Sequence, residues 1–429
     1  MRRYLLSCLT VVGLLLLGAC LLSYFLLRPP RIEIPPRRYP PNNAYDHYRL
    51  IGISVQNLHR ADPSLKALLE NVGRGVSIDA DEYTYLRQVY EPLLKEYRRH
   101  LDQPSVALLR YEPDYRLPEL AGFRDMVRIE RALMDYELRH GRTQQAMERF
   151  DTVARFSQQI RNEGSLIHFL VGRAILTIVI EPVAQQLPRL DRTALGHVVN
   201  TCRRYERERV PLVGSVRVEH YWGLSTIKQL YEGRYHAAPS DESGLQDVAI
   251  LMRMPFLRNA IYTSGVKEYD RYMKQVIAEI EKPHWQRKPI PEPEARGLGG
   301  ILVNILAPVF SQVAEHEAME QTQMRLLGCA AAIRLHKLRT GRYPARLEEL
   351  GLGEMIVDPF TGQPFRYKTD PRKGFLLYSV GANRRDEDGR RATAWDIRRG
   401  DVGVIPYRPR RDSGSSPQKI PLGAPVWLR

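Results

Sequence analysis

The residue types best suited to chemistry lie in an acidic loop near the C-terminus. Asp386 and Asp388 place two carboxylates one residue apart, after a short β-type run. Carboxylates are hard oxygen donors, and Ca²⁺ takes about 6–8 oxygen ligands. Four cations crowd the same loop: Arg384, Arg385, Arg390 and Arg391. The loop therefore predicts either a calcium site or a surface turn held by Arg–Asp ion pairs.

Other candidate sites are weaker. His316–Glu317 and Glu219–His220 are pairs of metal-ligating residue types. Neither has a further histidine at the spacing that puts two ligands on one helix face, so we interpret both as helix-surface pairs. The chain has no Gly-x-Ser-x-Gly, P-loop or dinucleotide motif, and Gly297–Gly300 lacks the preceding strand of a phosphate site. We therefore predict no catalytic and no cofactor-binding residues.

The composition predicts a folded, basic protein. A chain of 429 residues is long enough to bury real cores, and 43% hydrophobic residues exclude a fully disordered chain. The formal net charge of +15 favours anionic neighbours such as lipid headgroups. The alternative is that the arginines are spread over solvated helix faces beside acidic residues.

The N-terminus predicts a membrane anchor. Tyr4–Leu27 is an uninterrupted uncharged run that follows Arg2 and Arg3 and is followed by Arg28. A spanning helix needs about 20 apolar residues, so this run is long enough. Leu17–Cys20 resembles a lipoprotein cleavage box, but the following residues stay apolar, and we prefer an uncleaved anchor. The very short leading tail favours a signal anchor, with the body outside the cytoplasm of a bacterial cell.

The remaining chain predicts an α+β protein with a helical body and a small C-terminal sheet. Six prolines between 29 and 41 predict an extended, semi-rigid stalk. Apolar residues recur every three or four positions up to about Glu281, as expected of helices, and Asp191 stands where one of these helices needs an N-cap residue. The predicted segments are a transmembrane anchor (1–28), a Pro-rich stalk (29–44), an α-helical domain (45–281), a linker (282–297), a helix plus β module (298–407) and a disordered tail (408–429).

Within the helical domain, one stretch predicts a helical hairpin. Gly141, Ala146 and Phe150 match part of the tetratricopeptide pattern, in which small residues let two helices approach closely. One partial match predicts a single hairpin and no repeat array. Leu166–Ile180 is the most apolar segment of the body; it is interrupted by His168 and Arg173, and we interpret it as a buried core helix.

The C-terminal region carries three ordered motifs. A helix runs into Gly341-Arg342-Tyr343-Pro344, where Gly341 can adopt the left-handed cap and Pro344 stops the helix. Asp358–Tyr367 (Asp-Pro-Phe-Thr-Gly-Gln-Pro-Phe-Arg-Tyr) and Leu377–Asn383 (Leu-Tyr-Ser-Val-Gly-Ala-Asn) follow, and the Asp-Pro and Gly of the first predict a turn. Their order resembles the globular module of the major pseudopilin of type II secretion systems. The match covers residues 310–400, and the whole layout is similar to uncharacterised membrane-anchored bacterial proteins.

The resemblance implies a helix packed on a small antiparallel sheet and a calcium ion in the loop after the Tyr-Ser strand. Asn383 and Asp396 correspond to ligand positions of that family, so the full candidate set is Asn383, Asp386, Asp388 and Asp396. Two departures weigh against calcium: Ala394 stands where the family has an aspartate, and Asn383 carries no charge. The N-terminus also lacks the pseudopilin leader, so assembly into a pseudopilus by the usual route is not expected.

From these features we predict a single-pass protein of the bacterial inner membrane with a periplasmic body. The predicted role is a non-enzymatic structural or protein-binding one, linked to secretion or envelope assembly. Its predicted partners are membrane lipid, through residues 4–27, and other proteins; no nucleic acid and no small-molecule substrate are expected. The alternative is a membrane-anchored hydrolase or glycan-acting enzyme, whose site would gather Glu219, His220 and another carboxylate.

Overall fold

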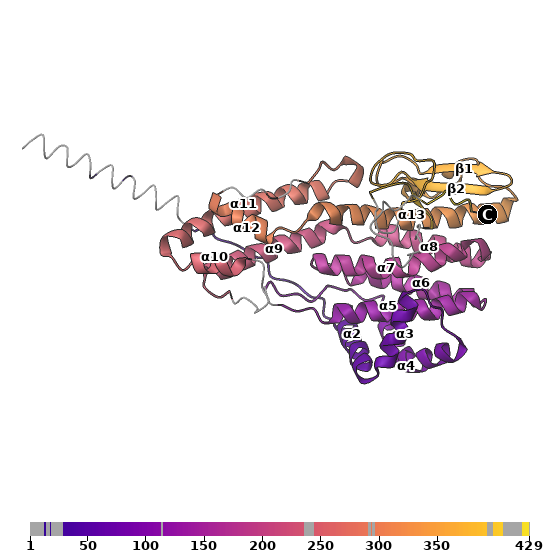
Figure 1. Cartoon of the computed structure of the whole chain (residues 1–429), viewed down its shortest axis with the longest axis horizontal. Helices are drawn as coiled ribbons and strands as arrows, with labels where there is room; N and C mark the ends of the chain where they lie inside the picture. The colour runs from indigo at the N-terminus through magenta and orange to yellow at the C-terminus, as the bar shows by residue number, and fades with distance from the viewer. Residues whose placement is uncertain are drawn as a thin grey trace, which may run out of the picture.

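The computed structural model describes residues 13, 18, 29–112, 115–235, 244–290, 293, 297–392, 398–405 and 423–428. Over these residues the chain is mostly helical and carries a small antiparallel sheet, as the sequence predicts (Figure 1). The predicted anchor lies outside the described residues except for the helical positions Gly13 and Gly18. The predicted tail also lies outside them, apart from residues 423–428.

The elements, in chain order, are α2 (Ala44–Ala61), α3 (Pro63–Gly73), α4 (Ala80–Arg99), α5 (Glu119–Arg139), α6 (Thr143–Gln159), α7 (Leu166–Gln186), η1 (Leu187–Arg189), α8 (Arg192–Glu208), α9 (Leu212–Tyr231), α10 (Leu245–Leu251), α11 (Pro255–Ile280), η2 (His284–Gln286), α12 (Gly297–Leu306), α13 (Phe310–Thr340), η3 (Leu347–Leu350), η4 (Gly353–Ile356), β1 (Arg366–Asp370), β2 (Gly374–Ser379) and β3 (Val402–Gly403). The η elements are short 3-10 helices.

Short-range signals set several helix ends. Asp191, the predicted N-cap of α8, accepts a hydrogen bond from the amide of Ala194, and Asp79 caps α4 in a reciprocal arrangement with Glu82. The predicted hairpin is α5 and α6, which pack on each other across a turn containing Gly141 at φ 72°. Ala146 and Phe150 are fully buried in this hairpin. These local predictions are confirmed because each depends on residues close in sequence.

The hydrophobic cores divide the chain differently from the predicted segments. One core joins α2 to α8 with most of α13 and the sheet, and the second joins α9 to α12 with the first turns of α13. Residues on both sides of the predicted 282–297 linker therefore share both cores. The start of α7 also belongs to the second core and its remainder to the first. α7 and α13 thus connect the two cores.

The Pro-rich segment is extended, as predicted, but lies along the body and does not stand free of it. Arg37 donates to the carbonyls of Ala107 and Glu163, and the Tyr39 hydroxyl donates to the carbonyl of Leu109. Ile32 packs against the second core. Prolines keep this segment extended, while its arginine and tyrosine side chains fix it to the loop after α4.

Two apolar stretches of the described chain are long enough to cross a membrane by length and composition: Leu166–Arg189 and Gly297–Thr340. The first contains α7, which is longer than the sequence indicated and packs against α5, α6, α9 and α13. Of its first nineteen residues, Ile167 alone is exposed. α7 is therefore surrounded by protein, as the core-helix interpretation expects.

The sheet has the strand order β1-β2-β3, with both pairings antiparallel. Tyr378 of β2 pairs with Arg366 of β1 on one side and with Gly403 of β3 on the other. Every residue of β2 is buried, and the sheet packs on α13 (Figure 1). The predicted left-handed cap of α13 is present, because Gly341 has φ 81°. Helix, cap and strands thus follow one another as the motifs indicate.

A buried ion pair fixes α13 to the helical body. Arg161, just after α6, and Glu320, in α13, are each 1% exposed, and their side chains make contacts of 3.0 and 3.2 Å. The Tyr205 hydroxyl of α8 donates to the same carboxylate at 2.6 Å. Three segments that are distant in sequence therefore meet at one carboxylate.

We predict that Glu320→Gln strongly destabilises the whole described body. The substitution leaves the Arg161 guanidinium buried without a countercharge, and loss of one partner of a buried pair costs about 3–5 kcal/mol. The free energy of unfolding, measured by urea denaturation of the full chain in detergent, should fall by that amount.

The matched control is Glu208→Gln, which removes the exposed pair with Arg207. An exposed pair contributes about 0–1 kcal/mol, so this variant should unfold near the wild-type midpoint. Equal midpoints for Glu320→Gln and the wild type would contradict the role given to the buried pair.

Candidate functional site

The four predicted calcium ligands all lie between β2 and β3, and each of the three described ones accepts hydrogen bonds or ion pairs from the loop or the sheet. Asn383 accepts from the amide of Arg385. Asp386 accepts from the Tyr378 hydroxyl at 2.8 Å and pairs with Arg366 at 3.1 Å. Asp388 pairs with Lys368 at 3.0 Å. Asp396 and Ala394 lie outside the described residues. In the described part of the loop, Asp386 and Asp388 are thus held by ion pairs whose cations come from β1, and calcium binding stays a prediction.

A different pair of carboxylates forms the centre of this loop. Asp401 is fully buried, and its Oδ2 accepts from the amides of Glu387 and Gly389 at 3.1 and 2.7 Å. Its Oδ1 and the Oε2 of Glu387 are buried and have no hydrogen-bond partner within the described part of the chain. Two neighbouring carboxyl groups, each with an oxygen that lacks a donor, are suited to a cation or a shared proton.

Electrostatics at this pair favour a bound positive charge. Burial, together with the nearby Glu387 carboxylate, raises the pKa of Asp401 to about 7. Sequence reasoning missed Asp401 because it lies after the predicted loop, at the start of the short run Val402–Ile405. An acidic residue heading a β-type run was the available signal, but its partner Glu387 is fourteen positions away.

The Asp358–Pro359 turn has a structural role. Asp358 accepts from the amide of Phe360 through Oδ1, and from that of Val380 through Oδ2. Its carbonyl accepts from Thr361 and from Gly362, which has φ 72°. This confirms the turn assigned to the motif, and it attaches the turn to the end of β2.

The pairs His316–Glu317 and Glu219–His220, which we interpreted as helix-surface pairs, are partly buried. Their side chains connect neighbouring segments. Glu317 binds Arg209, Arg287 and the amide of Leu212. Glu219 accepts from the amide of Leu166 at the start of α7, and burial raises its pKa.

His220 contacts Asp270 of α11 at 3.1 Å, so it faces a different neighbour from Glu219. The pocket that the enzyme alternative requires would have to gather both residues with a further carboxylate. On α9 the Glu219 carboxylate contacts the start of α7, whereas the His220 ring contacts α11.

A cleft of about 550 Å³ separates the Pro-rich segment from the loop after α4. Its polar lining consists of three arginines and three tyrosines: Arg37, Arg49, Arg110, Tyr39, Tyr111 and Tyr115. Such a lining supplies cations and hydroxyls for an anionic ligand. No carboxylate, histidine, serine or cysteine is among the described residues that line it.

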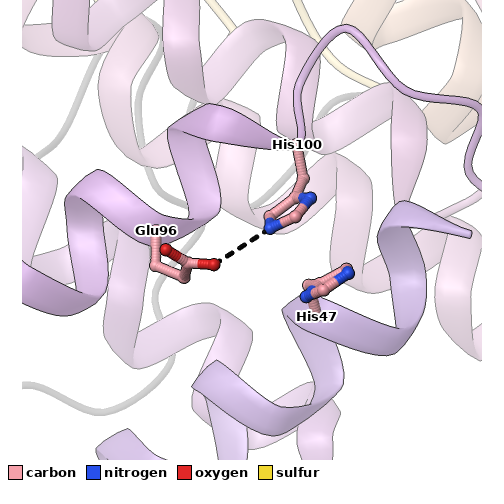
Figure 2. A group of neighbouring side chains, drawn as sticks. All are labelled: His47, Glu96 and His100. Atoms are coloured by element: carbon pink, nitrogen blue, oxygen red, sulfur yellow. Dashed lines mark hydrogen bonds and ion pairs between the residues drawn. The ribbon is translucent and has the colours of Figure 1, made fainter. Parts of the chain in front are cut away.

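A third group of side chains was missed by the sequence analysis. His47, Glu96 and His100 bring their ligand atoms within 4.8 Å of one another (Figure 2). Among the described residues, no other group of three His, Cys, Asp or Glu side chains brings its ligand atoms this close together. The available signal was Glu96-x-x-x-His100, which places two ligands on one helix face; the third comes from another helix.

Comparisons with known proteins assign no family to this geometry. Protein-family models, curated proteins and solved structures gave no match.

We predict that Asp401→Asn removes a pH-dependent loss of stability. Because the pKa of Asp401 is raised from 3.8 to about 7, the folded state keeps a proton that the unfolded chain releases above about pH 4. The wild type should therefore lose stability as pH rises from about 4 to 7, and the neutral asparagine should not. Thermal midpoints at pH 5 and pH 8 in a chelator measure this difference.

Calcium provides the second arm of the same experiment. Millimolar Ca²⁺ at pH 8 should raise the wild-type midpoint more than Mg²⁺ does, because Mg²⁺ demands tight octahedral geometry. Asp401→Asn should abolish the gain, and Asp370→Asn, outside the loop, should keep it. If the thermal midpoint changed equally between pH 5 and pH 8 in the wild type and in Asp401→Asn, the raised pKa assigned to Asp401 would be wrong.

Proposed function

We propose that this chain is a membrane-anchored, extracytoplasmic protein without catalytic activity, which binds other proteins through its C-terminal part. The observation that carries the proposal is the contact between Pro30 and α11. The Tyr262 hydroxyl donates to the Pro30 carbonyl at 3.1 Å, two residues after the predicted anchor ends. The body is therefore held within a few residues of the point where the chain would leave the bilayer.

The surface beside this contact is suited to a lipid headgroup region. Five apolar side chains are 36–54% exposed at this end of the molecule: Ile250, Leu251, Met254, Leu298 and Ile301. They belong to α10, the turn before α11, and α12, which lie together in Figure 1. Arg253, among them, is exposed as well. Exposed apolar side chains beside a cation are a common arrangement at membrane interfaces.

The opposite end of the molecule supports the protein-binding part of the proposal. The sheet lies on the C-terminal part of α13, away from α10 and α12 (Figure 1). A helix that ends at a glycine cap and packs on a small antiparallel sheet is what a pseudopilin-like module requires. β1, at one edge, presents Arg366 and Lys368 to solvent, and such charges discourage unspecific strand addition.

A groove offers a defined surface at this end. It has a volume of about 300 Å³ and runs between α8 and α13 beside η3. Its lining mixes apolar residues such as Leu335 and Leu350 with Arg203, His336 and Glu349. A mixed lining of this kind suits a peptide segment of a partner protein more than a small apolar ligand.

We predict that residues 1–28 alone make the protein an integral membrane protein. The full chain should remain in the membrane pellet after carbonate washing, and a chain of residues 29–429 should be released. Retention of the truncated chain would instead assign a spanning role to one of the apolar stretches Leu166–Arg189 and Gly297–Thr340.

The apolar end can be tested on the same truncated chain by flotation with vesicles containing anionic lipid. Ile250→Glu combined with Leu298→Glu should reduce co-flotation several-fold, because charged side chains disfavour insertion at the interface. The matched control is Leu50→Glu, a residue of α2 that is 65% exposed. Equal loss in the control variant would mean that added negative charge, and not this surface, decides the binding.

A further inference from the structure

The group His47, Glu96 and His100 combines two helices at one point. Glu96 lies in the last turn of α4, His100 follows that helix as its C-cap residue, and His47 lies in the first turn of α2. The Nε2 of His100 is 3.1 Å from Oε1 of Glu96. Figure 2 shows the His47 ring beside the His100 ring, and the Glu96 carboxylate facing a nitrogen at the edge of the His100 ring.

Packing beneath the group is rigid. Tyr48 and Tyr97, which adjoin His47 and Glu96 in sequence, both meet the ring of Phe156 edge-on, at 5.0 and 5.4 Å between centroids. All three aromatic side chains are at most 1% exposed. The α2 and α4 backbones are therefore fixed against α6, and the three polar side chains start from positions that cannot drift apart.

Neighbouring residues prepare two of the three groups to bind a metal. Gln103 Oε1 lies 2.9 Å from Nδ1 of His100, so this nitrogen carries a proton and donates it. That leaves Nε2 as the ligand atom, and it is the atom turned toward Glu96. Arg99 binds Oε2 of Glu96 at 2.8 Å, which leaves Oε1 for the ion. A second hydrogen bond on each ligand is the usual support of a protein metal site.

We propose that His47, Glu96 and His100 bind a divalent transition-metal ion, with Zn²⁺ as the best match. Two imidazoles and one carboxylate, with a fourth position open to water, form a common ligand set for zinc. His100 is buried, but the Glu96 side chain is 40% exposed, so the fourth position faces solvent. Unlike the carboxylates of the acidic loop, imidazole nitrogens favour zinc over calcium.

The two imidazoles stack, with centroids 3.6 Å apart and an angle of 10° between planes. Tetrahedral zinc at bond lengths of about 2.0–2.2 Å holds its ligand atoms about 3.3 Å apart. The most widely separated ligand atoms, at most 4.8 Å apart, must therefore close by up to about 1.5 Å, while Nε2 of His100 and Oε1 of Glu96 are already 3.1 Å apart. Half-buried His47 can do this by turning its ring out of the stack, while the backbones stay in place.

A bound ion would join α2 to the loop that receives the Pro-rich segment. Near His47, Asn43 exchanges two buried hydrogen bonds with Val106, at 2.8 and 2.9 Å. The same loop begins at His100 and carries Gln103. The ion would therefore strengthen the contact between the start of α2 and this loop, independently of any role at the membrane or in partner binding.

The test is a zinc titration of the full chain in detergent, purified without a polyhistidine tag. Calorimetry should find one Zn²⁺ per chain, and Co²⁺ should give visible absorption bands typical of a four-coordinate ion. His47→Gln and Glu96→Gln should each weaken Zn²⁺ binding at least tenfold. Gln103→Leu, which keeps all three ligands, should weaken it by about tenfold, the usual effect of losing a supporting hydrogen bond.

The matched control is His220→Gln. His220 has a carboxylate neighbour at the same 3.1 Å distance, but the described residues bring no third ligand to it, so this variant should bind zinc as the wild type does. Melting curves in a chelator identify any variant that fails to fold. If His47→Gln fails to fold, Glu96→Gln still tests the site, because Glu96 is half-exposed. The assignment is overturned if the wild type binds no zinc, if both ligand variants bind like the wild type, or if His220→Gln loses binding.

Discussion

The structure depends on one buried ion pair, between Arg161 and Glu320. It lies where α6, α8 and α13 meet, and water does not reach either side chain. Gly172 of α7 makes room for it, because a Cβ there would lie 2.7 Å from the Arg161 side chain. Phe169, one turn earlier, places its ring 5.0 Å from the guanidinium. The glycine in the apolar helix is thus explained by the arginine that passes over it.

Arginines perform this linking role at several points, which changes the meaning of the basic composition. Arg149 binds Glu130 and Glu137 inside the α5–α6 hairpin, Arg325 joins α13 to Glu206 of α8, and Arg287 reaches Glu317. The planar guanidinium suits such sites, because it can bind two acceptors in fixed directions. The expectation of scattered, solvated arginines therefore holds for only part of the set. A buried ion pair adds little net stability compared with an apolar contact, but removing one partner costs much stability because a charge is left buried. These pairs therefore specify which helices pack together.

What the sequence could predict follows from the range of each interaction. The cap at Gly341, the N-cap at Asp191 and the turn at Asp358 each depend on donors and acceptors within a few residues, and all three are present as predicted. The position of the Pro-rich segment, the sharing of α13 between two cores, and the pairing of Glu387 with Asp401 depend on contacts between distant residues. Composition and periodicity carry no information on such contacts. The third ligand of the histidine group, His47, was out of reach for the same reason.

The two stretches apolar enough to span a membrane are best explained by this architecture. α7 and α13 are the described helices that pass from one core into the other, and a helix covered on all sides must be apolar on all sides. Their composition therefore reflects burial in protein, and their polar residues, such as Glu320, have partners there. α12 differs, because Leu298 and Ile301 remain exposed although Leu302 and Val303 are buried. These two side chains form the part of the stretch that the protein leaves uncovered, on the side of the molecule where Pro30 is bound. Contact with lipid, as proposed, would give a physical reason for their exposure.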